Sequence, residues 1–237
     1  MLNTLGHLFN KTVNKLKTIY SEQEAKSITY LIVEEFFKLN RHEVSLSLGK
    51  RLTESEMLLM IRAYKKLLNH EPVQYIIGHS YFYDLKINVN KHTLVPRPET
   101  EELIHLIQNK HDRFDSILDI GTGSGCIALA LKSCYSSADV QAYDFSEEAI
   151  EVAKSNANEN DLTITFKRLD ILKQDIGGQF NLIISNPPYI KPSEQKLMHE
   201  NVLNHEPHNA LFIPEDDPLL FYRTIVSKAA KSLLKDG

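Results

Sequence analysis

The sequence has few cysteines and no long hydrophobic run. Cys126 and Cys134 are the only cysteines among 237 residues, too few for a disulfide framework or a cysteine-rich zinc site. No apolar stretch approaches the ~20 residues that span a bilayer, and the first residues lack the basic segment and apolar run of a secretory signal. We therefore expect buried thiols, no membrane association and a cytoplasmic location.

Positive charge is scarce in most of the chain. Residues 1–70 carry 11 Lys and Arg against 7 Asp and Glu, whereas residues 71–237 carry 16 against 24. Affinity for nucleic acids comes largely from positive charge that displaces counterions. Because residues 71–237 are acidic overall, we do not expect direct binding of nucleic acid. Hydrophobic residues at 42% and charged residues at 24% are ordinary for a globular protein.

Residues 1–75 are predicted to form a small helical domain. Ser21 and Thr53 each begin a capping-box pattern, with a Glu three residues further on. Apolar residues recur at helical spacing after both caps. Such a bundle serves either packing and dimerisation or the docking of a substrate, and we favour docking.

Residues 76–98 are predicted to be a β-hairpin linker, and residues 99–237 an α/β domain. In the linker, residues 81–89 alternate like a strand, Asn90-Lys91 is the expected turn, and 93–95 is a second short strand. In the domain, strands are expected at 116–120, 139–143, 163–168 and 180–185, with helices at 124–134, 147–158 and 218–234. This alternation predicts a Rossmann-like, doubly wound parallel sheet.

The chain ends on Asp236-Gly237, a helix C-cap signal. At this point an α/β unit would supply another strand. We therefore expect the C-terminal strands to be missing and the domain to be truncated.

A glycine-rich turn follows the first predicted strand of the α/β domain. Glycines let the backbone approach a ligand where a Cβ would collide. Asp144 ends the next strand, where a carboxylate can accept both hydroxyls of a ribose. The G-x-G-x-G spacing differs from the dinucleotide fingerprint, so a nucleotide cofactor without a pyrophosphate is favoured. The turn consists of Gly121, Thr122, Gly123, Ser124 and Gly125.

Asp170 follows the third predicted strand and is a candidate acceptor for an adenine amino group. Ile171 is the expected apolar neighbour of the adenine face. An Asp at the end of a strand is also an ordinary turn residue.

Asn186-Pro187-Pro188-Tyr189 follows the apolar strand that ends at Ser185. The Asn186 side-chain oxygen and the Pro187 carbonyl can each accept one N–H of a planar NH2 group and so aim its lone pair. Pro188 offers no competing N–H, and Tyr189 can stack on an amide or a base. Asn186, Pro187 and Tyr189 are the candidate catalytic residues, and Pro188 joins them as a candidate substrate-binding residue. Asn186 is also a candidate cofactor contact. The alternative is a strand-ending Asn-Pro turn.

His205, Glu206 and His208 lie in one loop that follows. Two histidines and a carboxylate in such a loop are more often polar surface groups than metal ligands. We predict no metal site.

These segments together resemble the bacterial release-factor glutamine methyltransferases, called PrmC or HemK. The resemblance covers nearly the whole chain. The Asn-Pro-Pro-Tyr motif is shared with other amine methyltransferases, whereas the segment 94–101 and the helical N-terminal region are more specific. The segments that carry it are 71–78, Leu-Val-Pro-Arg-Pro-Glu-Thr-Glu at 94–101, 121–125, 186–189, and Glu206-Pro207 before Ala210-Leu211.

The resemblance implies a class I methyltransferase fold and S-adenosylmethionine as cofactor, with S-adenosylhomocysteine as product. It implies methylation of the glutamine in the Gly-Gly-Gln motif of peptide-chain release factors. The helical domain is expected to help hold the release factor. We expect the enzyme to be a monomer. Many relatives are expected to have an aromatic residue where this chain has Ile171, which weakens stacking on adenine. Methylation of a ribosomal-protein glutamine and methylation of a base amino group are the alternatives.

Overall fold

The computed structural model describes residues 3–234 and divides into two compact units. The first comprises Met1–Ile77 with Glu200–His205, and the second comprises Gly78–His199 with Glu206–Gly237. Because the first unit includes a segment from far along the chain, the two units are not simply consecutive in sequence. The predicted cap at Asp236-Gly237 lies outside the described residues.

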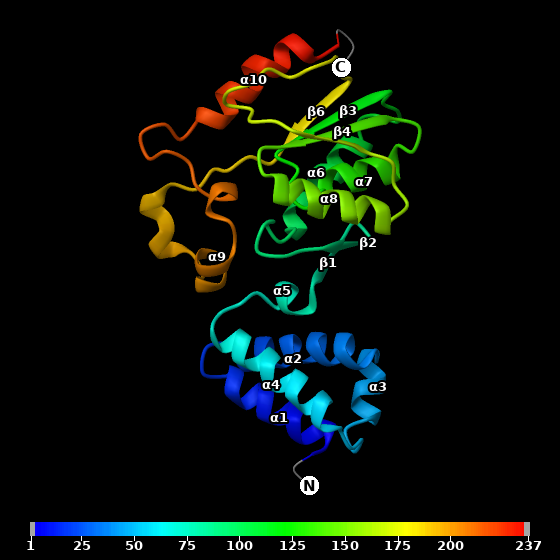
Figure 1. Ribbon diagram of the computed structural model, residues 1–237, viewed down its shortest axis with the longest axis vertical. Coiled ribbons are helices and arrows are strands. Elements are labelled where there is room, and N and C mark those ends of the chain that lie inside the picture. The colour runs from blue at the N-terminus through cyan, green and yellow to red at the C-terminus, as the bar shows by residue number, and fades with distance from the viewer. Residues whose placement is uncertain (1–2, 235–237) are drawn as a thin grey trace. The chain divides into compact units, whose positions relative to one another are not determined.

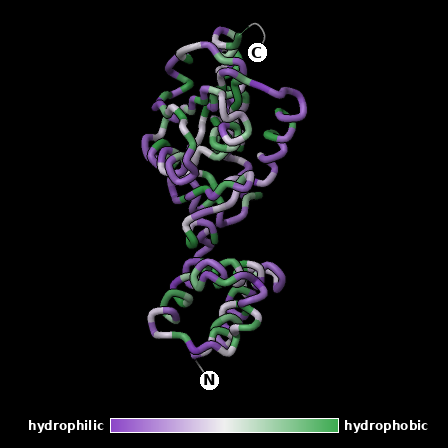
Figure 2. Tube along the Cα trace, turned by 90° about the vertical axis from the view of Figure 1, so that its right-hand side faces the viewer, coloured by the Kyte–Doolittle hydropathy of each residue, from purple (hydrophilic) through white to green (hydrophobic). Residues whose placement is uncertain are grey.

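The first unit is helical, as its cap signals predict. Ser21 accepts a hydrogen bond from the Glu24 amide at 3.2 Å, and Thr53 and Glu56 form a reciprocal capping box. Hydrophobic and hydrophilic stretches alternate along these helices (Figure 2). Their apolar faces meet in one core that includes Leu5, Ile32 and Met60, all fully buried. The helices are α1 Leu5–Leu16, α2 Glu22–Phe37, α3 Arg41–Leu46, α4 Glu54–Leu68, α5 Val73–Ile77 and α9 Glu200–His205.

Both ends of helix α9 contact the residues that follow α4. The His205 ring Nε2 lies 2.7 Å from the Asn69 carbonyl oxygen, and the His70 ring Nε2 lies 3.0 Å from a Glu200 carboxylate oxygen. These two contacts, one at each end of the short helix, connect it to the first unit.

The second unit begins with a hairpin whose turn differs from the expected one. Strand β1, His79–Phe82, pairs antiparallel with β2, Leu85–Asn88. Tyr83 and Asp84 form the turn with φ of 52° and 61°, the left-handed conformation of two-residue hairpin turns. Residues 90–93 form a turn, as predicted, in which the Thr93 amide donates to the Asn90 carbonyl at 3.0 Å, but 93–95 is not a strand. The turn of the hairpin instead falls at 83–84, within the segment 81–89 that was predicted to be one strand. Turns of this kind usually contain Gly or Asn, and neither occurs at 83–84 to signal it.

A four-stranded parallel sheet forms the centre of the second unit. Its order is β5-β4-β3-β6, so the chain winds outward in both directions from β3 and β4. The elements are α6 Pro98–Gln108, β3 Ser116–Ile120, α7 Cys126–Cys134, β4 Asp139–Asp144, α8 Glu147–Glu159, β5 Thr165–Arg168, β6 Leu182–Ser185, the 3-10 turns Pro192–Leu197 and His208–Ala210, and α10 Leu220–Ser232. This confirms the predicted doubly wound parallel sheet.

Helices cover both faces of this sheet (Figure 1). Phe221, Ile225 and Ala229 of α10 pack against the face that presents Leu118 and Ile120. Helices α7 and α8 pack on the other face, against β3, β4 and β5. The carboxyl ends of all four strands lie along one edge, the position at which open α/β sheets bind ligands.

Candidate active site

A cavity of about 610 Å³ lies at the carboxyl ends of the strands of the second unit. Its volume is within the range of small-molecule sites. Ten of the twelve predicted site residues line it: Gly121, Thr122, Gly123, Ser124, Asp144, Asp170, Ile171, Asn186, Pro187 and Pro188. Of the other two, Gly125 packs against Leu129 and Ala153, and the Tyr189 side chain is 61% exposed.

The glycine turn is held by the neighbouring strand. The amides of Gly121 and Thr122 both donate to the Tyr143 carbonyl at the end of β4, at 2.8 and 3.0 Å. Gly121 and Gly123 have φ of 74° and 56°, and a Cβ built on either would meet no atom within 4 Å. The space above the turn is thus open to a ligand that approaches the backbone closely.

Asp144 organises the turn from the end of β4. Its side chain accepts hydrogen bonds from the Gly123 and Ser146 amides, each at 2.9 Å. Burial raises the pKa of this carboxyl, and the backbone hydrogen bonds oppose that rise. A carboxylate has about four acceptor positions, and the backbone amides of Ser146, Gly123 and Phe145 do not use all of them. The position fits the predicted ribose acceptor.

Asp119 is a second buried carboxyl beneath the turn. It is fully buried, and one oxygen accepts a 2.7 Å hydrogen bond from the Thr122 hydroxyl. Its other oxygen, Oδ1, is buried without a hydrogen-bond partner. Desolvation raises the pKa of Asp119 to about 7. The open space at Gly121 and Gly123 fits a site that takes a polar cofactor.

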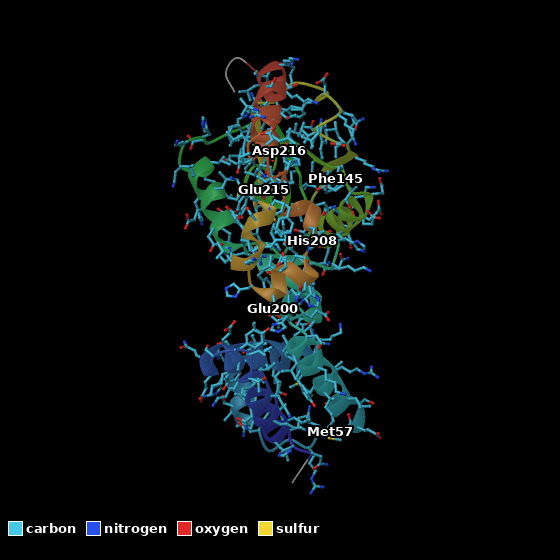
Figure 3. The ribbon with its side chains drawn as sticks, turned by 90° about the vertical axis from the view of Figure 1, so that its left-hand side faces the viewer. Met57, Phe145, Glu200, His208, Glu215 and Asp216 are labelled. Carbon is cyan, nitrogen blue, oxygen red and sulfur yellow. The ribbon has the colours of Figure 1, made fainter. Side chains whose placement is uncertain are left out.

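Asp170 and Ile171, which follow strand β5, line the same cavity. Asp170 accepts from the Leu172 amide at 3.0 Å and lies 2.9 Å from the Lys173 ammonium. The hydrogen bond from Lys173, opposed by slight desolvation, lowers its pKa. Ile171 is only 7% exposed. Phe145, labelled in Figure 3, also lines the cavity and is 45% exposed, so it adds an aromatic ring to the wall.

The segment Asn186 to Tyr189 leaves β6 beside the glycine turn. The Ser185 hydroxyl donates to the Ile120 carbonyl at 2.7 Å, which ties the ends of β6 and β3 together. Pro187 is buried, whereas Asn186 is exposed and lines the cavity. An acceptor side chain and a nucleotide-type turn therefore lie on the wall of one cavity.

Two family models match this chain. The PrmC N-terminal domain matches residues 7–78, and the methyltransferase small domain matches residues 98–211. A release factor glutamine methyltransferase of Flavobacterium psychrophilum is 42% identical over 95% of this chain and 81% of its own length. Proteins of the same name from Bacteroides thetaiotaomicron and Streptococcus pneumoniae are each 38% identical, over 94% and 98% of this chain and 80% and 82% of their own lengths.

The chain belongs to the release factor glutamine methyltransferase family. It is a methyltransferase, and its fold is a methyltransferase α/β domain with an N-terminal helical region. The family assignment and the fold class predicted from the sequence are confirmed. Within residues 3–234, no helix is long and apolar enough to cross a membrane, and no three His, Cys, Asp or Glu residues are grouped to hold a metal ion.

One buried residue of this methyltransferase, Asn156 on α8, was not predicted from the sequence. Its side-chain amide donates to the Ser124 and Asn88 carbonyls at 2.9 and 3.0 Å, and its oxygen accepts from the Asn88 amide at 2.8 Å. It therefore joins the hairpin to the glycine turn. The only signal was its place on the apolar stripe of Ala149, Ile150 and Ala153, where a polar residue needs partners.

Replacing Asp144 is expected to weaken binding of the cofactor. Asp144→Ala removes the predicted acceptor of the ribose hydroxyls and should cost about 1–3 kcal/mol of affinity for S-adenosylhomocysteine, measured by isothermal titration calorimetry. The control is Asp139→Ala, at the exposed opposite end of the same strand. Equal affinity in both variants would remove Asp144 from the site.

The buried Asp119 should make stability depend on pH. Because its pKa in the folded protein, about 7, exceeds the ordinary 3.8, the folded state retains this proton over that interval and its stability falls as pH rises. Asp119→Asn keeps an acceptor for Thr122 and is expected to remove this contribution. The Tm of the variant minus that of wild type should therefore be larger at about pH 8 than at about pH 5. The same difference in Tm at both values would contradict the assignment.

Proposed function

We propose that this protein transfers a methyl group to the side-chain amide nitrogen, N5, of the glutamine in the Gly-Gly-Gln motif of peptide-chain release factors. The methyl donor is S-adenosylmethionine. One observation carries the proposal: Asn186, Pro187 and Pro188 line the same cavity as the glycine turn and Asp144. The relatives' name supplies the acceptor protein.

The cofactor is held by the glycine turn and by the three strand ends beside it. S-adenosylmethionine supplies an activated methyl group on a sulfonium. Asp144 accepts from the ribose hydroxyls with its remaining lone pairs. Asp170 faces the adenine amino group, and Ile171 provides an apolar contact for the adenine ring.

The acceptor amide is oriented by the segment after β6. Its NH2 lone pair is delocalised, so reaction requires the amide to be held at a fixed angle to the methyl group. The Asn186 side-chain oxygen and the Pro187 carbonyl accept its two N–H groups. Pro188 has no N–H to compete for them. Tyr189, whose ring is 61% exposed, stacks on the amide plane.

The helices of residues 1–75 dock the release factor, and residues 76–98 connect them to the catalytic domain of residues 99–237. An excess of Lys and Arg over Asp and Glu in residues 1–70 suits an acidic partner surface. The enzyme acts as a monomer in the cytoplasm, where release factors work.

Mass spectrometry of a purified release factor incubated with this protein and S-adenosylmethionine tests the proposal. We expect one added methyl group on the glutamine of Gly-Gly-Gln, and none on a release factor in which this glutamine is alanine. An unmodified glutamine, with cofactor binding demonstrated, would contradict the proposal. Ribosomal protein, then DNA and RNA, would be the next substrates to test with the same protein.

A further inference from the structure

An ion pair on the wall of the cavity has no part in the chemistry described so far. The Arg97 guanidinium donates from Nη2 to a Glu206 carboxylate oxygen at 2.6 Å. The other Glu206 oxygen accepts from the Val95 amide at 3.3 Å. The Glu206 side chain is 1% exposed and that of Arg97 is 37% exposed. The carboxylate is thus fixed on both oxygens to residues 95–97.

Glu206 begins a segment that supports the acceptor motif. Ile190 directly follows Tyr189, and its amide donates to the Leu211 carbonyl at 3.0 Å, while its carbonyl accepts from the Ile213 amide at 3.0 Å. Ala210 and Ile213 also line the cavity. Residues 206–213, which we call the support segment, therefore hold the backbone that leaves Asn186 to Tyr189.

The support segment is joined to the rest of the cavity wall by this pair. Residues 95–97, on the other side of the contact, also line the cavity and lead into α6. Arg97 is the N-cap residue of α6, but its side chain makes no capping hydrogen bond. Its guanidinium is used instead to join two wall segments that are 109 residues apart in sequence.

Stability alone is a poor reason for such a pair. Apolar residues of similar size often replace a buried ion pair without loss of stability, because desolvation offsets the attraction between the charges. Two apolar side chains would not reproduce the directional hydrogen bonds that join the Arg97 guanidinium and the Val95 amide to the Glu206 carboxylate. The geometry therefore suits the positioning of a neighbouring group.

We propose that Arg97 and Glu206 are positioning residues for the acceptor motif. The pair locks the support segment to residues 95–97 and so holds Asn186 to Tyr189 at the angle that the acceptor amide requires. This inference rests on the proposed function for its kinetic consequence, but not for its structural one.

The test replaces both partners together, as Arg97→Met with Glu206→Met, to avoid leaving a buried carboxylate unpaired. We expect a Tm lowered only by the loss of the acceptor of the Val95 amide, with wild-type affinity for S-adenosylhomocysteine and an unchanged KM for the release factor. The kcat should fall by about 100-fold, the loss that a displacement of about 1 Å can cause. Arg97→Lys keeps the charge and one donor, and should recover most of this kcat because a single nitrogen makes the contact.

Hydrogen exchange provides a readout that needs no substrate. Between Pro188 and Pro192 only Tyr189, Ile190 and Lys191 carry exchangeable amides, and that of Ile190 is bonded to Leu211. Exchange in this peptide should be faster in the double variant than in wild type. The matched control is Arg113→Met with Asp115→Met, an exposed pair at 77% and 71%, which should leave both exchange and kcat unchanged.

Each result decides the inference. Unchanged exchange at 189–191, wild-type kcat in the folded double variant, or a loss of cofactor affinity as large as the loss of kcat would overturn it. If the double variant does not fold, Glu206→Gln takes its place, since it keeps the size of the side chain and loses one acceptor, with the same expectations. If wild type itself methylates no release factor, the proposed function fails, whereas the exchange result still decides whether the pair holds the motif.

Discussion

Asn186→Ala is expected to reduce methyl transfer to the release factor by about 100- to 1,000-fold, the usual effect of removing one preorganised hydrogen-bonding group at a reacting centre. Asn186 lies on the cavity wall, at the carboxyl end of β6. In the proposed mechanism, the acceptor amide then loses one of the two contacts that fix its angle. Affinity for S-adenosylhomocysteine should change little, since the glycine turn and Asp144 are intact.

The measurement is single-turnover transfer of a labelled methyl group, with calorimetric binding of S-adenosylhomocysteine beside it. Asn109→Ala, at the exposed end of α6, is the matched control and should behave as wild type. A variant at position 186 that transfers methyl at the wild-type rate would refute the proposed mechanism. A parallel loss of cofactor affinity would instead make Asn186 mainly a cofactor-binding residue.

Gly125→Ala is expected to be the most destabilising single methyl addition in the glycine turn. Gly125 has φ of +84°, and a Cβ there would lie 2.6 Å from Leu129 Cδ1 and 3.1 Å from Ala153 Cβ. The left-handed conformation costs about 1–2 kcal/mol for a residue with a Cβ, and overpacking adds about 1–3 kcal/mol. Each kcal/mol should lower Tm by about 2–4 °C in a protein of this size.

Substitutions at two other glycines distinguish the effect of core packing from the effect of contact with the cofactor. At Gly123 an added Cβ meets nothing within 4 Å, so Gly123→Ala carries only the cost of its φ of +56°. It should lose less thermal stability than Gly125→Ala but bind S-adenosylhomocysteine more weakly, because the methyl group projects from the turn that holds the cofactor. Gly49→Ala, also in open space, is the control for both measurements. A similar fall in Tm at 123 and 125 would contradict the packing argument.

The sequence predicted the location of the candidate site residues that lie at the ends of strands. An apolar strand followed by G-x-G-x-G, and a second strand that ends in Asp144, place both groups at one edge because parallel strands share their carboxyl ends. The same rule brought Asn186 to that edge. The alternation of strands and helices predicted the doubly wound parallel sheet, but not the register of its strands.

Sequence patterns did not indicate contacts between distant segments. Arg97 and Glu206 are 109 residues apart, and neither belongs to a periodic pattern that would place one beside the other. Asn156 interrupts an apolar stripe, which signals a buried amide but not its partners. The hairpin turn at Tyr83-Asp84 uses two residues without the usual glycine, so the pattern of residues 81–89 predicted one strand where the structure has a turn between two strands.

The discontinuous make-up of the helical unit has a consequence for how the chain folds during synthesis. His205 and Asn69, which meet in that unit, are 136 residues apart. Helices α1 to α5 leave the ribosome first, yet α9 arrives only after β6 and the acceptor motif have been made. The unit therefore completes its packing late, and contacts of such long range slow folding. Cutting the chain once, near residue 77, would separate α9 from the helices on which it packs.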